Sequence, residues 1–297
     1  MNFLLGLEGE RLENIIDNRL KGVGMIRSEY LCRSIEEYFT LNSCREYVYN
    51  YVSNVCDIFH DYEVWYRTSE LTVPEVNVLK GADQIIEEKH YILGLRGVRR
   101  GIKFSDTFLL ELDNISKLSE EKKNLNILFP YVKDSNELKK CIELLKKVNF
   151  KNKFGVMIEI PSAITEIDEF IKLGISNITI GVNDLTTLML GSYRESEVHD
   201  ITHPSIVKVI DYIVKKCKDN NVSVNVAGNV NKKLKEICAN VGVENFIVNY
   251  PLLSDVLNIP LEKLPEINRL KDIKKLTKSR IIEFNKRKKQ QNYNYWT

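Results

Sequence analysis

The chain has 297 residues, of which 43% are hydrophobic and 28% charged, so it can bury the core of a globular protein. Its formal net charge of +2 gives no basis for nucleic-acid binding, and no apolar run approaches the roughly 20 residues that a membrane span needs. We therefore expect neither a nucleic-acid partner nor a membrane.

The N-terminus is strand-like, turns acidic at Glu8 and shows no features of a secretory signal. The six cysteines along the chain form no C-x-x-C pair and accompany no histidine cluster, which argues against a zinc site. Scattered thiols without a signal fit a reducing compartment, so we expect a cytoplasmic protein.

Short runs rich in β-branched and aromatic residues alternate with longer amphipathic stretches along the chain. Eight such runs are predicted strands, at 2–8, 22–28, 63–69, 125–131, 153–160, 177–183, 222–228 and 245–251. Amphipathic helical patterns lie at 10–20, 135–148, 164–174 and 204–220. Eight strands, each followed by helix, predict an α/β fold, the (β/α)8 TIM barrel. A doubly wound open sheet is the alternative, because spacing alone does not show closure.

Three segments go beyond this simple repeat. Residues 29–62 predict a helical excursion, and residues 70–124 predict a loop with GLRGVRRG followed by further helices. After about residue 260 the chain becomes lysine-rich, with apolar residues at roughly helical spacing. We predict a barrel domain at 1–260 and a basic C-terminal helical extension at 261–297. A solvated terminal helix is the simpler interpretation of this extension, and a polyanion- or partner-binding tail is the alternative.

Charged and amide side chains fall where predicted strands end, or in the loops that follow. In a barrel these ends share one mouth, where ligands bind. The residues are Arg27, Arg67, Arg96, Glu159, Asn183, Asp184 and Arg194. A single arginine of this kind is usually a surface ion-pair partner, but several in one mouth need an anion between them. Because the two carboxylates can hold Mg²⁺, the mouth is predicted to bind a small, multiply anionic, metal-chelating ligand.

Six motifs carry a family resemblance, and they read GVGMIRSEYL (22–31), VWYRTSE (64–70), LGLRGVRR (93–100), ILFPYV (127–132), GVMIEIPSA (155–163) and ITIGVNDLTTLMLGSYRES (178–196). Together they resemble the C-terminal barrel of the phosphoenolpyruvate-utilising enzymes, in family order over about residues 2–257. That family includes phosphoenolpyruvate synthase, pyruvate phosphate dikinase and enzyme I of the sugar phosphotransferase system. The loop VWYRTSELTVPEVNVLKG is most similar to that of phosphoenolpyruvate synthase.

The resemblance implies a role for each residue of the mouth. Three arginines would bind the phosphate of phosphoenolpyruvate, and they are Arg27, Arg67 and Arg96, the last two also catalytic. Asn183 would contact the phosphate or the rest of the substrate, and Arg194 would clamp its carboxylate. The metal ligands would be Glu159 and Asp184, holding Mg²⁺ or Mn²⁺.

The chain also departs from the family pattern. In the family, a cysteine on strand seven protonates the enolate when pyruvate forms, and here Ala227 occupies that position. Pro74 stands where the family loop has an asparagine. No ATP-grasp domain and no phosphohistidine motif accompany the barrel motifs. We therefore expect a free-standing barrel, with any ATP-grasp and phosphohistidine proteins on separate chains.

Three functions fit these features. The first is the phosphoenolpyruvate/pyruvate half of a split phosphotransfer system resembling phosphoenolpyruvate synthase. The second is an Mg²⁺-enolate lyase or aldolase acting on a 2-oxo acid, since an enolate that meets no acid can attack another electrophile. The third is a non-catalytic phosphoenolpyruvate-binding regulatory or partner subunit. Because family barrels of this kind commonly dimerise, we expect a homodimer.

Overall fold

The eight strands expected from the sequence all form, and they close into one barrel in chain order with every neighbouring pair parallel. The computed structural model describes residues 1–12, 17–88 and 93–293, with side chains up to Lys288. The (β/α)8 prediction is confirmed, and the doubly wound alternative is wrong. The strands are β1 (Asn2–Leu7), β2 (Leu20–Arg27), β3 (Val64–Arg67), β4 (Leu125–Phe129), β5 (Phe154–Ile158), β6 (Asn177–Gly181), β7 (Ser223–Ala227) and β8 (Asn245–Asn249).

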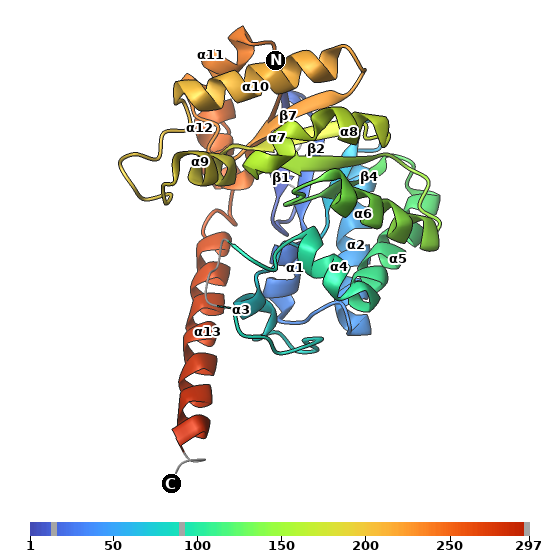
Figure 1. Ribbon diagram of the computed structural model, residues 1–297, viewed down its shortest axis with the longest axis vertical. Coiled ribbons are helices and arrows are strands. Elements are labelled where there is room, and N and C mark those ends of the chain that lie inside the picture. Colours follow the sequence, from blue (N-terminus) through green and yellow to red (C-terminus); the bar gives the residue numbers. More distant parts are fainter. Residues whose placement is uncertain (13–16, 89–92, 294–297) are drawn as a thin grey trace.

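Helices surround this barrel (Figure 1). They are α1 (Ser28–Ile35), α2 (Asn42–Ile58), α3 (Val73–Val76), α4 (Val98–Lys103), α5 (Ser105–Glu121), α6 (Ser135–Lys147), α7 (Pro161–Thr165), α8 (Ile167–Lys172), α9 (Val182–Leu190), α10 (Pro204–Lys218), α11 (Lys232–Asn240), η1 (Tyr250–Leu252), α12 (Leu253–Leu257), η2 (Leu261–Lys263) and α13 (Arg269–Tyr293). Among the described helices, none combines the length and the apolar character that a membrane crossing requires.

Most helical predictions are confirmed, with two differences. The pattern at 164–174 forms two short helices, α7 and α8, which break at Glu166. The helix expected at 10–20 does not form in the described part of that segment, because 10–12 and 17–19 are not helical and Leu20 begins β2. Residues 13–16 lie outside the described part of the chain. The excursion at 29–62 is the helix pair α1 and α2, as expected.

Alternation along the strands aims the charged residues into the barrel mouth. A small core cluster fills the barrel itself, and it comprises Met25, Trp65, Leu128, Met157, Ala227 and Ile247. Side chains of a strand alternate between faces, so the residue two positions further on also points inward. Arg27 follows Met25 in this way, Arg67 follows Trp65, and the chain leaving β5 carries the pattern on to Glu159.

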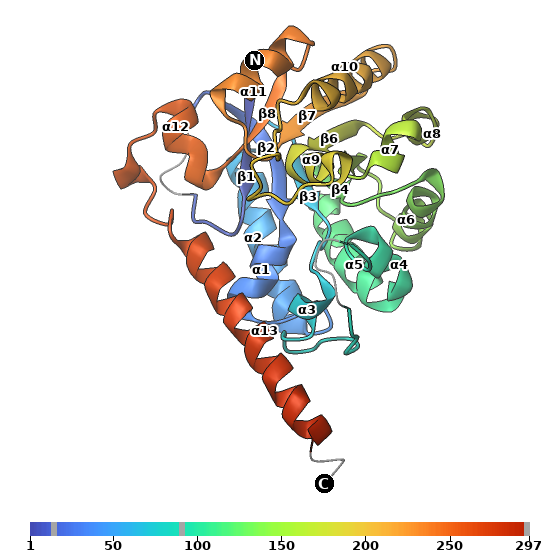
Figure 2. The same ribbon diagram turned by 60° about the vertical axis from the view of Figure 1, so that its left-hand side comes forward.

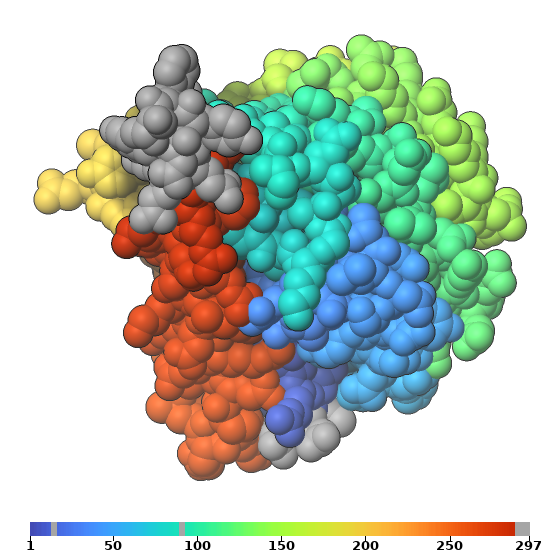
Figure 3. All heavy atoms as spheres, turned by 90° about the horizontal axis from the view of Figure 1, so that it is seen from below, coloured from blue at the N-terminus to red at the C-terminus, as the bar shows by residue number. Residues whose placement is uncertain are grey.

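The C-terminal extension is a long helix, α13, that runs alongside α1 and α3 and away from the barrel strands (Figures 1 and 2). Seen from below, the red α13 lies along the teal segment that contains α3 (Figure 3). Ile273, Ile281 and Phe284 are half-buried, and Arg280 forms an ion pair with Glu36. The helix is therefore docked on the body of the protein along part of its length.

A buried carboxyl group fixes the loop that leaves β3. Glu111 of α5 accepts hydrogen bonds from the Tyr66 hydroxyl at 2.9 Å and from the Ser69 backbone N–H at 2.8 Å. Burial raises the pKa of Glu111 to about 8, and these two hydrogen bonds offset only part of that effect. The loop that they hold carries Glu70 into the mouth, so Glu111 connects the core to the site.

This pKa predicts how stability depends on pH. The pKa of Glu111 is near 4.5 in the unfolded chain and near 8 in the folded one, so its contribution to the free energy of unfolding is complete below pH 4.5 and is lost as the pH rises through 8. In Glu111→Gln, the free energy of unfolding should therefore fall less steeply with pH, by up to about 1.4 kcal/mol per pH unit between pH 4.5 and 8. Urea unfolding across this pH range measures it, with exposed Glu120→Gln on the same helix as control. An unchanged slope in Glu111→Gln would show that this carboxyl does not hold its proton.

Candidate functional site

All seven residues that the sequence placed in the mouth line one cavity of about 720 Å³ at the C-terminal ends of the strands. Arg27 ends β2, Arg67 ends β3, and Glu159 follows β5 directly. Arg96 lies just before α4, and Arg194 follows α9. The cavity therefore gathers side chains from six different places in the chain, as a barrel mouth does.

One placement differs from the prediction. β6 ends at Gly181, so Asn183 and Asp184 are not strand-end residues but belong to the first turn of α9. An acidic side chain is favourable there, because the backbone N–H groups of a helix start are unpaired. Gly181 itself is required by close packing, since a Cβ at this position would lie 2.6 Å from Cγ of Glu159.

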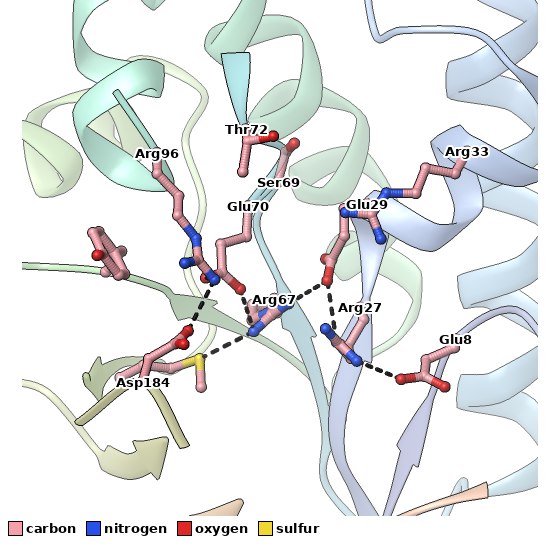
Figure 4. A network of polar contacts seen from close by, with 12 residues as sticks. Glu8, Arg27, Glu29, Arg33, Arg67, Ser69, Glu70, Thr72, Arg96 and Asp184 are labelled. Carbon is pink, nitrogen blue, oxygen red and sulfur yellow. Dashed lines mark hydrogen bonds and ion pairs between the residues drawn. The ribbon is translucent and has the colours of Figure 1, made fainter. Parts of the chain in front are cut away.

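Protein carboxylates lie between the arginines of the mouth (Figure 4). The ion pairs form an alternating chain that runs Glu8, Arg27, Glu29, Arg67, Glu70, Arg96, Asp184 and Arg194. Glu70 lies 2.5 Å from a guanidinium nitrogen of Arg67 and 2.5 Å from one of Arg96. Asp184 lies 2.9 Å from Arg96 and 2.5 Å from Arg194. Each arginine thus has an internal counter-charge before any ligand arrives.

Sequence reasoning missed three of these carboxylates. Glu29 and Glu70 are almost fully buried, and each follows a strand-end arginine by two or three positions. Burial alone would raise the pKa of Glu29, but Arg67 and Arg27 lower it to about 2. An acid so close after each strand-end arginine was the available signal. The third carboxylate, Glu8, comes directly after β1 and is the last residue of the predicted strand at 2–8, so its position at a strand end was the available signal.

Three buried carboxylates meet at one point of the cavity, and they are Glu70, Glu159 and Asp184. One oxygen of each lies within 4.8 Å of the others. Burial first, and then the charges of Glu70 and Asp184, raise the pKa of Glu159 to about 8. Within the described residues no cation forms an ion pair with Glu159, whose carboxylate accepts the backbone N–H of Tyr131 at 3.0 Å. An all-oxygen set that lacks one counter-charge fits Mg²⁺ or Mn²⁺.

Ala227 closes the inner wall of the cavity. It is 2% exposed and packs in the barrel cluster with Met25 and Met157, while Gly228 and Asn229 continue the cavity lining. All six cysteines are buried, and none lines this cavity. Burial raises the pKa of both thiols nearest in sequence, Cys217 and Cys238, to about 12. No thiol of the described chain is therefore available to protonate a ligand in the mouth.

The C-terminal helix adds residues that the sequence did not assign to the site. Leu270, Lys274 and Lys278 of α13 line the same cavity. The Lys274 ammonium lies 5.8 Å from the centre of the Tyr30 ring, and in the described structure neither lysine forms an ion pair with a carboxylate. The simpler expectation of a solvated terminal helix is therefore incomplete, because α13 supplies two uncompensated cations to the mouth.

Residues 8–257 match the family model described as PEP-utilising enzyme, PEP-binding domain. The chain is 28% identical over 246 residues to a probable phosphoenolpyruvate synthase of Pyrococcus horikoshii, covering 77% of this chain and 30% of that protein. It is 30% identical over 223 residues to a probable phosphoenolpyruvate synthase of Methanocaldococcus jannaschii, covering 70% of this chain and 19% of that protein. The chain thus spans less than a third of the length of these curated relatives.

A solved structure of an HpcH/HpaI aldolase/citrate lyase family protein from Burkholderia cenocepacia superposes with a TM-score of 0.52. The alignment covers 84% of this chain and 87% of that one, at 13% sequence identity. At this identity the likeness supports the barrel fold alone.

The position of the α13 lysines predicts a role in attracting anions. Replacing both Lys274 and Lys278 with alanine should weaken binding of inorganic phosphate roughly threefold to tenfold, because each exposed charge contributes up to about 1 kcal/mol. The salt dependence of binding should also decrease. Phosphate titrations at two ionic strengths measure both effects. The matched control replaces Lys271 and Lys275, exposed on the same helix but outside the cavity, and equal losses in both variants would contradict the assignment.

Proposed function

The chain belongs to the PEP-utilising enzymes, as their PEP-binding domain, and from this premise we propose that its mouth binds phosphoenolpyruvate or the enolate of pyruvate together with Mg²⁺. The observation that carries the proposal is the buried carboxylate cluster inside a cavity that is also lined by five arginines. A ligand with a phosphate, a carboxylate and a chelating enol oxygen matches this set, because guanidinium groups pair with the two anions and Mg²⁺ with oxygen.

Each residue has a defined role in this proposal. Glu159 and Asp184 would hold Mg²⁺, which when bound would act as a Lewis acid on the enolate oxygen. Arg67 and Arg96 would neutralise the phosphoryl group as it transfers, which makes them the catalytic residues. The remaining contacts would orient the substrate, with Arg27 on the phosphate, Asn183 beside it and Arg194 on the carboxylate.

The phosphoryl donor in this proposal is a phosphohistidine that reaches the mouth from outside the described residues. Among those residues, no histidine lines the cavity. A split phosphotransfer system, with the phosphohistidine and ATP-grasp proteins on separate chains, stays a prediction. The activity of the full-length relatives, the homodimer and the cytoplasmic location are likewise proposals for this chain.

Ala227 favours a second candidate function. A methyl group at the wall of the mouth has no proton to transfer, and no cysteine lines the cavity among the described residues. General acid catalysis is worth roughly 10²–10⁴-fold, so phosphoenolpyruvate turnover by the thiol route would be slow. An enolate that is not promptly protonated can instead attack a carbonyl carbon, as in an Mg²⁺-dependent lyase or aldolase acting on a 2-oxo acid. A site that binds without turnover is the third interpretation.

Binding of phosphoenolpyruvate should depend on Mg²⁺, and calorimetry with and without the metal measures this directly. Glu159→Ala should abolish the dependence by removing a ligand. Arg194→Ala should weaken binding by only about 1 kcal/mol, because its side chain is 50% exposed and its charge is screened by solvent. Glu63→Ala, an exposed partner of Lys153, is the control and should bind as the unchanged protein does. Equal binding with and without Mg²⁺ would exclude the proposed site.

The chemistry at Ala227 can be tested through the C3 protons of pyruvate. The unchanged protein should exchange these protons with D₂O slowly, because no thiol faces the mouth. Ala227→Cys should accelerate the exchange in the presence of Mg²⁺, and Glu159→Ala in the same chain should cancel the gain. Proton NMR of pyruvate in D₂O gives the rates. Fast exchange by the unchanged protein would mean that another group already acts as the acid, and would remove the argument for a lyase.

A further inference from the structure

We propose that Glu70 is a positioning residue that exchanges partners when the site fills. Without metal its carboxylate bridges Arg67 and Arg96; with metal it becomes a third carboxylate ligand and releases both arginines to the anion. This inference rests on the proposed function, since it deepens the same metal and anion site.

The position of Glu70 supports the first half of the exchange. Its side chain is 3% exposed, and the loop after β3 points its carboxylate between the two guanidinium groups (Figure 4). Both contacts are 2.5 Å. The two arginines are those expected to act on the phosphoryl group as it transfers, so an internal carboxylate occupies the place between them.

The arginines are incompletely satisfied in this arrangement. The Nε atoms of Arg67 and Arg96 are both buried and have no hydrogen-bond acceptor in the described structure. Oε1 of Glu70, although close to Arg96, lies at an angle that makes an ion pair and not a hydrogen bond. A tetrahedral phosphate offers more oxygens than one carboxylate and can engage both forks, so these unused donors favour a phosphate as the replacement.

The second half of the exchange follows from the carboxylate cluster. Glu70 already lies within 4.8 Å of oxygens of Glu159 and Asp184, so joining a metal needs only a small movement of its side chain. If Glu70 left the arginines without any ligand present, its buried charge would lose both cation partners, and Arg67 and Arg96 would each keep only one carboxylate, Glu29 and Asp184 respectively. Breaking buried ion pairs in this way is destabilising. A metal ion compensates the carboxylate and an anion compensates the arginines. Each ligand therefore removes the obstacle to the other, and the two should bind with positive coupling.

The test measures Mn²⁺ affinity by electron paramagnetic resonance of the free ion, with and without inorganic phosphate. In the unchanged protein, phosphate should tighten Mn²⁺ at least tenfold. In Glu70→Gln, Mn²⁺ alone should bind at least fivefold more weakly, phosphate alone should bind more tightly, and the coupling should fall below threefold. Glu75→Gln is the matched control, because Glu75 lines the same cavity and pairs with Arg33 but lies outside the cluster; it should keep the full coupling.

Full coupling in Glu70→Gln would overturn the proposal. If that variant does not fold, Glu70→Asp answers the same question, because its carboxylate is one methylene shorter and should lower the coupling at least threefold. The two proposals fail separately. Coupling that depends on Glu70, without binding of phosphoenolpyruvate, would leave the exchange intact and reject the function. Mg²⁺-dependent binding of phosphoenolpyruvate with unchanged coupling in both Glu70 variants would support the proposed function and reject the partner exchange of Glu70.

Discussion

Guanidinium groups at the top of a barrel need a counter-charge, because removing one partner of a buried ion pair costs about 3–5 kcal/mol. In this protein four arginines of the mouth alternate with four carboxylates in one continuous chain of ion pairs. That balance fixes the arginine side chains without a ligand and leaves Glu159, within the buried carboxylate cluster, with no ion pair to a cation among the described residues. What the site lacks is therefore a small cation beside the carboxylate oxygens of Glu159.

This balance changes how an anionic substrate would bind. The substrate would not enter an open ring of arginines but would replace carboxylates that already occupy them. The uncompensated cations lie further out, at Lys274 and Lys278 on α13, where they can attract an anion before any exchange occurs. At the inner wall Ala227 presents a methyl group to the same space. The mouth therefore combines the proposed metal and anion sites with a wall that carries no thiol at the position where the family has its cysteine.

Much of the fold and part of the site could be predicted from the sequence. Period-two alternation is a local property, so it located the strands and directed Arg27, Arg67 and Glu159 inward. The placement of Asp184 was less accurate, because a helix start directly after β6 looks like a strand end in sequence. Pairings such as Glu70 with Arg96 depend on how distant loops meet. The docking of α13 over the mouth depends in the same way on contacts with α1 and α3, which no local pattern contains.

A crystal structure with Mn²⁺ and phosphoenolpyruvate tests the charge balance of the mouth most directly, because the anomalous signal of manganese locates the metal independently. We expect one anomalous peak with oxygens of Glu159 and Asp184 at about 2.0–2.2 Å, and the phosphate in contact with Arg67 and Arg96. Glu70 should have left those arginines and turned toward the metal. Two results would contradict this description of the site. One is a metal bound elsewhere, and the other is a phosphate that binds away from Arg67 and Arg96 while Glu70 keeps its ion pairs with both.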